Sequence, residues 1–123
     1  MRERPTVAPD AAAPFDADGG SFSVHKWRGS GPPYVHVHHA DDECWHVLEG
    51  ALTFRIGEES VEAGAGASVF VPAGVPHTYQ AAEGARYLVV LTPRLRRLIE
   101  ELQRSDRSAH AEIFRRHESE ILG

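Results

Sequence analysis

The chain has 123 residues, 41% hydrophobic and 25% charged, so it can bury one core and leaves little room for a second domain. Its 13 basic and 18 acidic side chains give a net charge of −5, which argues against nucleic acid as a partner. No segment approaches the roughly 18 apolar residues of a membrane span. With a single cysteine and hence no internal disulfide, we expect a cytoplasmic protein without nucleic-acid or membrane partners.

Residues 1–20 are rich in proline, alanine and aspartate and lack an apolar run, which predicts a flexible arm rather than a signal peptide. Residues 21–92 consist of short β-like runs broken by glycine and proline, a pattern typical of an all-β barrel or sandwich. The predicted strands span residues 21–27, 34–39, 43–49, 51–56, 60–63, 67–71, 77–80 and 85–92.

The hydrophobic period changes after residue 92. Thr92 can cap a helix, Pro93 suits its first turn, and leucine and isoleucine then recur at helical spacing. A second amphipathic run predicts another helix over about 108–121, with Ile113, Phe114, His117 and Ile121 on one side. We expect residues 93–123 to be helical and to cover an open sheet face or a partner subunit.

The segment YVHVHHADDECWHVLEG, residues 34–50, holds four of the eight histidines of the chain. Successive side chains of a strand point to opposite faces, so His36 and His38 project together and His39 projects away from them. A short acidic turn leads to the next strand, which opens with Glu43. If Glu43 faces inward, two imidazoles from one strand and a carboxylate from the strand expected to lie beside it converge on one point, as a divalent first-row metal requires.

The segment PAGVPHTYQ places His77 at the start of a later strand, directly after two prolines and a glycine. Proline fixes φ and removes a backbone donor, so this segment predicts a rigid turn that delivers a strand at a set angle. Such a turn is suited to positioning one side chain. His77 is therefore a candidate for a fourth ligand.

Two motifs of the chain resemble those of the cupin family of small jelly-roll barrels. GPPYVHVHHADDECWHVLEG, residues 31–50, is similar to the first cupin motif, and GASVFVPAGVPHTYQA, residues 66–81, is similar to the second. The first motif has a four-residue spacer after Gly31 where the family usually has five, and Ala81 replaces the usual asparagine. The resemblance covers about residues 21–92. It implies a small single-domain cupin, similar to quercetin dioxygenase, with a double-stranded β-helix fold.

The resemblance also implies a ligand set. The family's metal ligands fall on His36, His38, Glu43 and His77, all of which are present in this chain. Imidazole and carboxylate together suit iron, manganese, nickel or zinc, so we expect one divalent transition metal without choosing among these. Four ligands would close a tetrahedral zinc site, whereas an octahedral ion would keep two positions free for substrate or dioxygen.

Three aromatic residues share the face of the ligands beside them, namely Tyr34, Trp45 and Tyr79. They either fill the barrel or line a cavity in which a flat or aromatic substrate meets the metal. Phe54, Phe70 and Val47 are expected to be plain core. The remaining histidines are expected to lie on the surface or to have ordinary structural roles; they are His25, His39, His46, His110 and His117.

Three classes of function remain open. The first is a dioxygenase-like oxidoreductase acting on a small enolic or aromatic molecule, in which Glu43 serves as both ligand and catalytic base. The second is a non-redox isomerase, cyclase or decarboxylase that uses the metal as a Lewis acid. The third is a protein that binds a small molecule without catalysis. We also expect a homodimer, because apolar side chains point outward from the predicted strands and helices.

Overall fold

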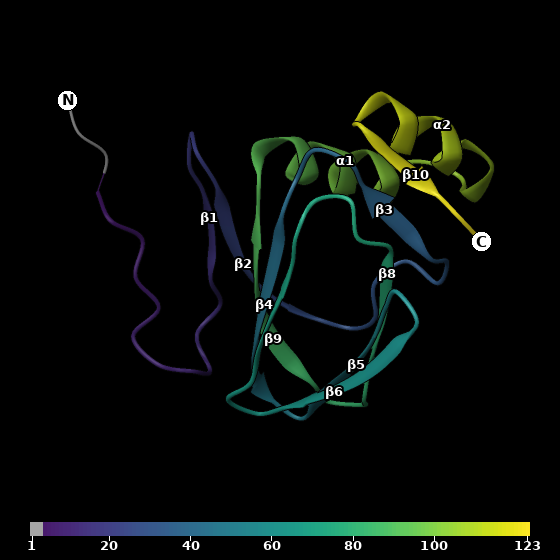
Figure 1. The fold of residues 1–123 in the computed structure, drawn as a ribbon. Helices are drawn as coiled ribbons and strands as arrows, with labels where there is room; N and C mark the ends of the chain where they lie inside the picture. Colours follow the sequence, from purple (N-terminus) through teal and green to yellow (C-terminus); the bar gives the residue numbers. More distant parts are fainter. Residues whose placement is uncertain (1–3) are drawn as a thin grey trace.

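The computed structural model describes residues 4–123, which form two five-stranded antiparallel sheets (Figure 1). In spatial order, the first sheet contains β1 (Asp16–Asp18), β2 (Ser23–Arg28), β9 (Arg86–Leu91), β4 (Glu43–Glu49) and β7 (Ser68–Val71). The second contains β10 (Ser119–Ile121), β3 (His36–His38), β8 (His77–Ala81), β5 (Ala51–Ile56) and β6 (Glu59–Gly64). From β3 to β9 the chain passes repeatedly between the sheets, which confirms the predicted double-stranded β-helix.

The core lies between the two sheets because alternate side chains of each strand point inward. In β4, Glu43, Trp45 and Val47 are buried while the residues between them are only partly covered. The Trp45 ring meets the Phe54 ring of the opposite sheet, with 5.0 Å between the ring centroids. The prediction of Val47 and Phe54 as core residues is therefore confirmed.

The prediction of Phe70 as a core residue is wrong. Phe70 is 60% exposed, whereas its neighbours Val69 and Val71 are buried. In β7 these two valines take the inward positions, so the alternation of the strand turns Phe70 outward.

The turn between β4 and β5 requires glycine. Gly50 has a φ of 73°, a left-handed conformation that side-chain-bearing residues rarely adopt. A Cβ at this position would lie 2.9 Å from the Cα of Ala85. Gly50, the last residue of the first motif, therefore permits the close approach of the turn to the neighbouring loop.

The C-terminal region begins as predicted and ends differently. Helix α1 (Pro93–Gln103) starts at Thr92, whose hydroxyl oxygen accepts a hydrogen bond from the Leu95 N–H at 3.2 Å. A short 3₁₀ turn, η1 (Arg107–Ala109), leads into α2 (His110–Arg116).

The prediction of a helix up to about residue 121 is wrong. Helix α2 ends at Arg116, and Glu118 takes a left-handed φ of 55° that stops the helix. The next residues form β10, which pairs with β3 and supplies hydrogen bonds to what would otherwise be a sheet edge.

The helices cover one end of the barrel, above β3, β4 and β9 in Figure 1. Their inward-facing residues are fully buried and continue the barrel core; they are Leu95, Leu98, Ile113 and Phe114. Within residues 4–123, no helix combines the length and apolar character that a membrane crossing needs.

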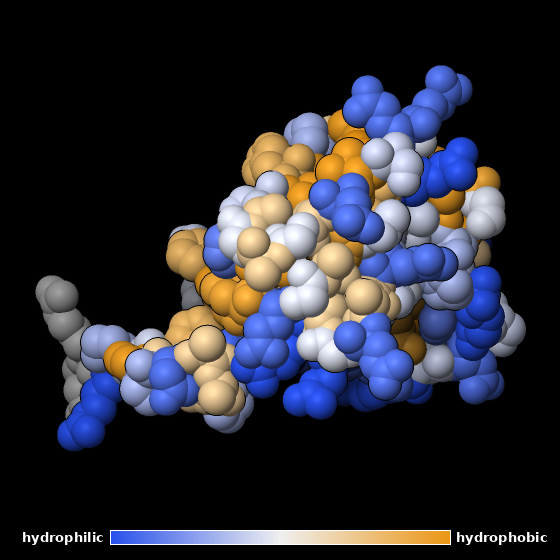
Figure 2. All heavy atoms as spheres, turned by 90° about the horizontal axis from the view of Figure 1, so that it is seen from below, coloured by the Kyte–Doolittle hydropathy of each residue, from blue (hydrophilic) through white to orange (hydrophobic). Residues whose placement is uncertain are grey.

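The predicted N-terminal arm contributes one short strand to the first sheet. Residues 16–18 form β1 at the sheet edge, and the Lys26 ammonium donates hydrogen bonds to the carbonyls of Ala11 and Ala13. Arg86 also donates to the Ala11 carbonyl, at 2.7 Å. Seen from below, the described part of the arm, from residue 4 on, extends to one side of the barrel (Figure 2).

Candidate metal centre

Strands β3 and β8 bring three histidines together inside the barrel. His36 lies directly opposite His77 in the antiparallel pair, and His38 shares the inward face of β3 with His36. All three side chains are buried, and each offers a nitrogen within 4.8 Å of the others. Alternation along the strand and the rigid turn before β8 therefore bring the three predicted imidazoles to one point.

Glu43 approaches these histidines from across the barrel. It opens β4, which belongs to the other sheet, so the expectation that the carboxylate comes from a strand next to β3 is wrong. The Oε1 atom of Glu43 lies 3.5 Å from Nε2 of His38 and 3.5 Å from Nε2 of His77. The structure thus brings all four predicted ligand residues together from two sheets.

Each imidazole has its Nδ1 atom engaged away from the centre. Nδ1 of His36 donates to the Tyr34 carbonyl at 3.1 Å, and Nδ1 of His77 donates to the Val75 carbonyl at 3.0 Å. Because a carbonyl can only accept, Nδ1 of each of these two rings carries a proton, and the neutral form of each ring then has its lone pair on Nε2. Their Nε2 lone pairs are left free, which is the arrangement found in histidines that bind metals.

The electrostatics of the cluster favour the neutral form of His36 and the ionised form of Glu43. Burial, together with the neighbouring His77 and His38, lowers the pKa of His36 to about 3. Burial would raise the pKa of Glu43, but the close approach of His38 and His77, each 3.5 Å from Oε1, and their charge interactions with the carboxylate outweigh burial and lower the pKa to about 2. At neutral pH the site therefore holds the anionic carboxylate of Glu43 beside the neutral imidazole of His36.

This donor set fits a divalent cation. Oε1 of Glu43 and Nε2 of His77 are both buried, and neither has a hydrogen-bond partner. Buried polar atoms without partners cost free energy unless something else satisfies them. A proton could bridge one imidazole and the carboxylate, whereas one metal ion would satisfy all four groups together.

The two motif turns that carry the ligands are bonded to each other. The Gly74 N–H donates to the His38 carbonyl at 2.8 Å, and the Ala73 N–H donates to the Asp42 carboxylate at 2.8 Å. Gly74 adopts a φ of 87°, which glycine tolerates without strain. These contacts hold the turn before His77 against the end of β3.

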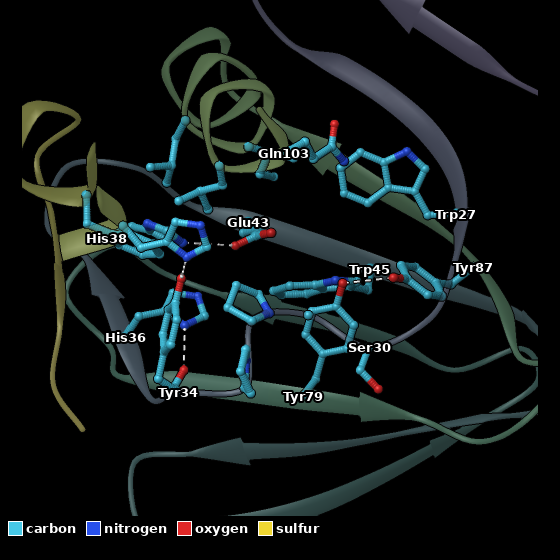
Figure 3. Close-up of a pocket in the computed structure, with 18 of the residues that line it drawn as sticks. Trp27, Ser30, Tyr34, His36, His38, Glu43, Trp45, Tyr79, Tyr87 and Gln103 are labelled. Atoms are coloured by element: carbon cyan, nitrogen blue, oxygen red, sulfur yellow. Dashed lines mark hydrogen bonds and ion pairs between the residues drawn. The ribbon is translucent and has the colours of Figure 1, made fainter. Parts of the chain in front are cut away.

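A cavity of about 500 Å³ opens beside the cluster (Figure 3). His36, His38 and Glu43 lie on one side of the cavity, and Trp45 and Tyr79 line the wall next to them. Tyr34 also faces this space. All three aromatic residues border the cavity and also belong to the buried core of the barrel, so the two roles considered for them overlap, and contact with a substrate stays a prediction.

The wall farther from the histidines contains a chain of hydroxyl groups. The Tyr87 hydroxyl donates to the Gly29 carbonyl at 2.8 Å, so the Tyr79 hydroxyl, 2.8 Å from it, donates to Tyr87. Burial raises the pKa of Tyr79, and the adjacent Tyr87 raises it further. Both phenols are therefore neutral groups that offer oxygen lone pairs and aromatic surface to the cavity.

The C-terminal helices supply a part of the cavity wall that the sequence pattern did not predict. Helices α1 and α2 provide six residues of the lining, namely Leu98, Ile99, Leu102, Gln103, His110 and Phe114. His110, which we expected to be ordinary, has Nδ1 3.0 Å from the Tyr34 hydroxyl. The amphipathic pattern correctly showed that these helices bury a face, but it carries no information about which cavity that face adjoins.

The other histidines lie away from the cluster. His39 and His46 point outward as expected, with Nε2 of His39 3.3 Å from Glu120 and Nδ1 of His46 2.8 Å from Ser68. His25 is buried, and its Nδ1 lies 2.7 Å from the Asp16 carboxylate.

Comparisons with known proteins agree with this architecture. An uncharacterised protein of Streptomyces coelicolor is 39% identical over 56 residues, which is 45% of this chain and 53% of the relative. The chain therefore matches about half of the length of this curated relative.

Solved structures share the fold at low sequence identity. A cupin protein from Bacteroides fragilis has a TM-score of 0.54 at 23% identity, covering 75% of this chain and 86% of its own. KdgF from Halomonas sp. has a TM-score of 0.55 at 18% identity, covering 73% of this chain and 86% of its own. A cupin-2 domain protein from Shewanella frigidimarina has a TM-score of 0.52 at 24% identity, covering 69% of this chain and 84% of its own.

The family match covers the barrel. The description of the matching family is "Cupin domain", and the match extends over residues 23–92, which is more than half of the chain and contains both motifs. Together with the two-sheet barrel and its buried histidines, this match shows that the chain belongs to the cupin family.

Proposed function

We propose that this protein is a metal-dependent, dioxygenase-like oxidoreductase that acts on a small enolic or aromatic molecule. The observation that carries the proposal is the buried cluster of three histidines and one glutamate opening into an aromatic cavity. His36, His38, Glu43 and His77 would hold one divalent iron, manganese, nickel or zinc ion. When bound, such an ion supplies Lewis-acid or redox chemistry to substrate oxygens.

The size and walls of the cavity support the proposed substrate class. Its volume of about 500 Å³ suits a small molecule, and its walls are mostly aromatic and aliphatic. Trp45 and Tyr79 present flat surfaces beside the histidines, with 5.4 Å between their ring centroids. These two rings pack edge to face and form one aromatic wall, so a planar, largely apolar molecule with oxygen donors at one end would place those oxygens near the metal and its rings against this wall.

Glu43 is the proposed proton acceptor as well as a ligand. Among the described residues that line the cavity it is the only carboxylate, and it is ionised at neutral pH. It would accept the proton of an enol or phenol hydroxyl as that oxygen approaches. The phenols of Tyr79 and Tyr87 do not compete for this role, because burial raises the pKa of each above its ordinary value.

Two alternatives use the same cavity. A non-redox isomerase, cyclase or decarboxylase would need only the Lewis-acid property of the ion. A binding protein would need the aromatic walls but no turnover. The cavity geometry suits all three functions, and dependence on oxygen separates them.

The test begins with metal analysis of protein purified without a nickel column. Metal-free protein is then loaded separately with Fe²⁺, Mn²⁺, Ni²⁺ or Zn²⁺ and screened in an oxygen electrode against catechols, flavonols and small enols. The proposal expects oxygen uptake that requires both metal and substrate and is lost in Glu43→Gln. Turnover that continues without oxygen would favour the non-redox enzyme, and tight binding without turnover would favour the binding protein.

We further propose a cytoplasmic homodimer. Cys44 of β4 lies opposite Phe70 on one side and opposite Val90 of β9 on the other, which forms an apolar row on the outer face of the first sheet. Phe70 is the most exposed member of this row at 60%. Burying the row against a second copy would remove this apolar surface from water, and Phe70→Glu should then shift the molecular mass in light scattering to that of a monomer.

A further inference from the structure

The third imidazole of the cluster is held differently from the other two. His36 and His77 donate from Nδ1 to backbone carbonyls two residues earlier in the chain. His38 has its Nδ1 atom 2.7 Å from the hydroxyl oxygen of Ser119, a residue 81 positions later in the sequence. One candidate ligand therefore depends on a side chain from the C-terminal strand.

The hydrogen-bond network sets the direction of this contact. The Ser119 hydroxyl donates to the His117 carbonyl at 3.1 Å, so the hydroxyl proton is already used in a hydrogen bond. Ser119 can then only accept from His38, which places the imidazole proton on Nδ1 and leaves Nε2 free toward Glu43. Both side chains are buried, with exposed fractions of 3% for Ser119 and 6% for His38, so water does not replace the contact.

The backbone explains why Ser119 reaches this position. Ser119 is the direct partner of His38 in the β10–β3 pair, so the two side chains share the inward face. The strand is held at its start by the His39 N–H, which donates to the Glu118 carbonyl at 2.8 Å. Strand β10 lies outside residues 23–92, the part of the chain that matches the cupin family.

We propose that Ser119 is a positioning residue for the metal centre, selecting the Nδ1–H form of His38 and so keeping its Nε2 lone pair available to the cation. The C-terminal strand is then a structural part of the centre and not only a cover over the barrel. This inference rests on the proposed metal site. Loss of a hydrogen-bond partner of a metal-binding histidine typically weakens metal affinity by about 10- to 100-fold.

The test compares two variants of nearly equal shape. Ser119→Thr keeps the hydroxyl and Ser119→Val removes it, while both add similar bulk to the strand. We expect Ser119→Val to weaken the Kd for Zn²⁺, measured by competition with a chromophoric chelator, at least 10-fold relative to Ser119→Thr. Ser119→Ala should show the same loss relative to the natural protein.

A matched control is available on the outside of the barrel. Ser68 and His46 form an equivalent serine–histidine contact at 2.8 Å between β7 and β4, away from the cavity. Ser68→Ala should leave the Kd for Zn²⁺ unchanged. Equal affinities for Ser119→Thr and Ser119→Val, with both variants folded by circular dichroism, would overturn the proposal.

A second measurement does not require metal. Long-range ¹H–¹⁵N correlation spectra of the metal-free protein report which imidazole nitrogen carries the proton. We expect His38 in the Nδ1–H form in the natural protein and in Ser119→Thr, and a mixed or Nε2–H form in Ser119→Val. If the natural protein binds no metal, the proposed function fails, yet these spectra still decide the role of Ser119; an unchanged His38 signal in Ser119→Val would refute it.

Discussion

The barrel and the C-terminal region contribute to the same cavity in different ways. The barrel, residues 23–92, carries both motifs and all four candidate ligands. Residues 93–123 carry no ligand, yet they line the cavity from above and provide the hydroxyl group that contacts His38. The barrel therefore supplies the candidate ligands and most of the aromatic wall, whereas the C-terminal region completes the cavity wall and contacts one candidate ligand from the side away from the centre.

The two regions also differ in how their residues reach the site. In the barrel, strand alternation and two short turns place each ligand, so the relevant residues recur at fixed spacing. In the C-terminal region, packing against the barrel places each residue, because Phe114 and Ser119 reach the histidines only through tertiary contact. Substitutions in the two regions should therefore affect metal binding and folding in different proportions.

The largest effect is expected from a substitution in the barrel. His77→Ala should weaken metal affinity by at least about 1,000-fold, because losing a ligand costs more than losing the hydrogen-bond partner of a ligand. Metal content after equilibrium dialysis, measured by plasma mass spectrometry, checks the expectation. His46→Ala is the control, since this histidine points out of the barrel. Equal metal content in His77→Ala and the natural protein would show that His77 is not a ligand of the metal centre.

Much of the barrel could be predicted from the sequence because its pattern is local. The inward positions of His36 and His38 follow from the alternation of side chains along a strand. The proline- and glycine-containing turn PAGVP predicts the start of the strand that carries His77. The pairing of strands is not local, so alternation alone could not show that Glu43 lies in the opposite sheet.

The C-terminal region shows a stronger limit of prediction. Residues 108–121 have an amphipathic period, and the period continues past the point at which α2 ends. The left-handed Glu118 and the pairing with β3 end the helix, and neither has a signature in the local sequence. Because the predicted helix included Ser119, the contact with His38 could not be anticipated.

The next largest effect is expected at Phe114, where a substitution shows whether the C-terminal region folds as one unit with the barrel. Phe114 is fully buried, and its ring centroid lies 5.5 Å from that of His36 and 5.6 Å from that of Tyr34. Phe114→Ala should lower the free energy of unfolding by about 3 kcal/mol, because it leaves a cavity against the barrel. Urea unfolding followed by tryptophan fluorescence and by circular dichroism should give coincident transitions. Separate transitions, or a loss below about 1 kcal/mol, would show that the two regions fold independently.

A smaller effect is expected at the junction of the two regions. Thr92 caps α1, and its hydroxyl donates to the buried Asp41 carboxylate at 2.9 Å. Thr92→Ala should lower the free energy of unfolding by about 1 kcal/mol, the usual value of a helix cap, without changing the Kd for Zn²⁺. Chemical denaturation and metal competition on the same sample check both parts. A weaker Kd without loss of stability would mean that this junction acts on the metal centre directly.

The smallest effect is expected at the point where α2 gives way to β10. Glu118 is the one non-glycine residue with positive φ among the described residues, at 55°, and a left-handed conformation is costly for a residue with a side chain. Glu118→Gly removes that cost but adds freedom to the unfolded chain, so we expect the free energy of unfolding to rise by only about 0.5 kcal/mol. Glu120→Gly, on the outward face of β10, is the control and should be destabilising, because glycine weakens a strand. If Glu118→Gly instead lowers both stability and metal affinity, the glutamate side chain itself helps to seat β10, and Ser119 depends on more than backbone conformation to reach His38.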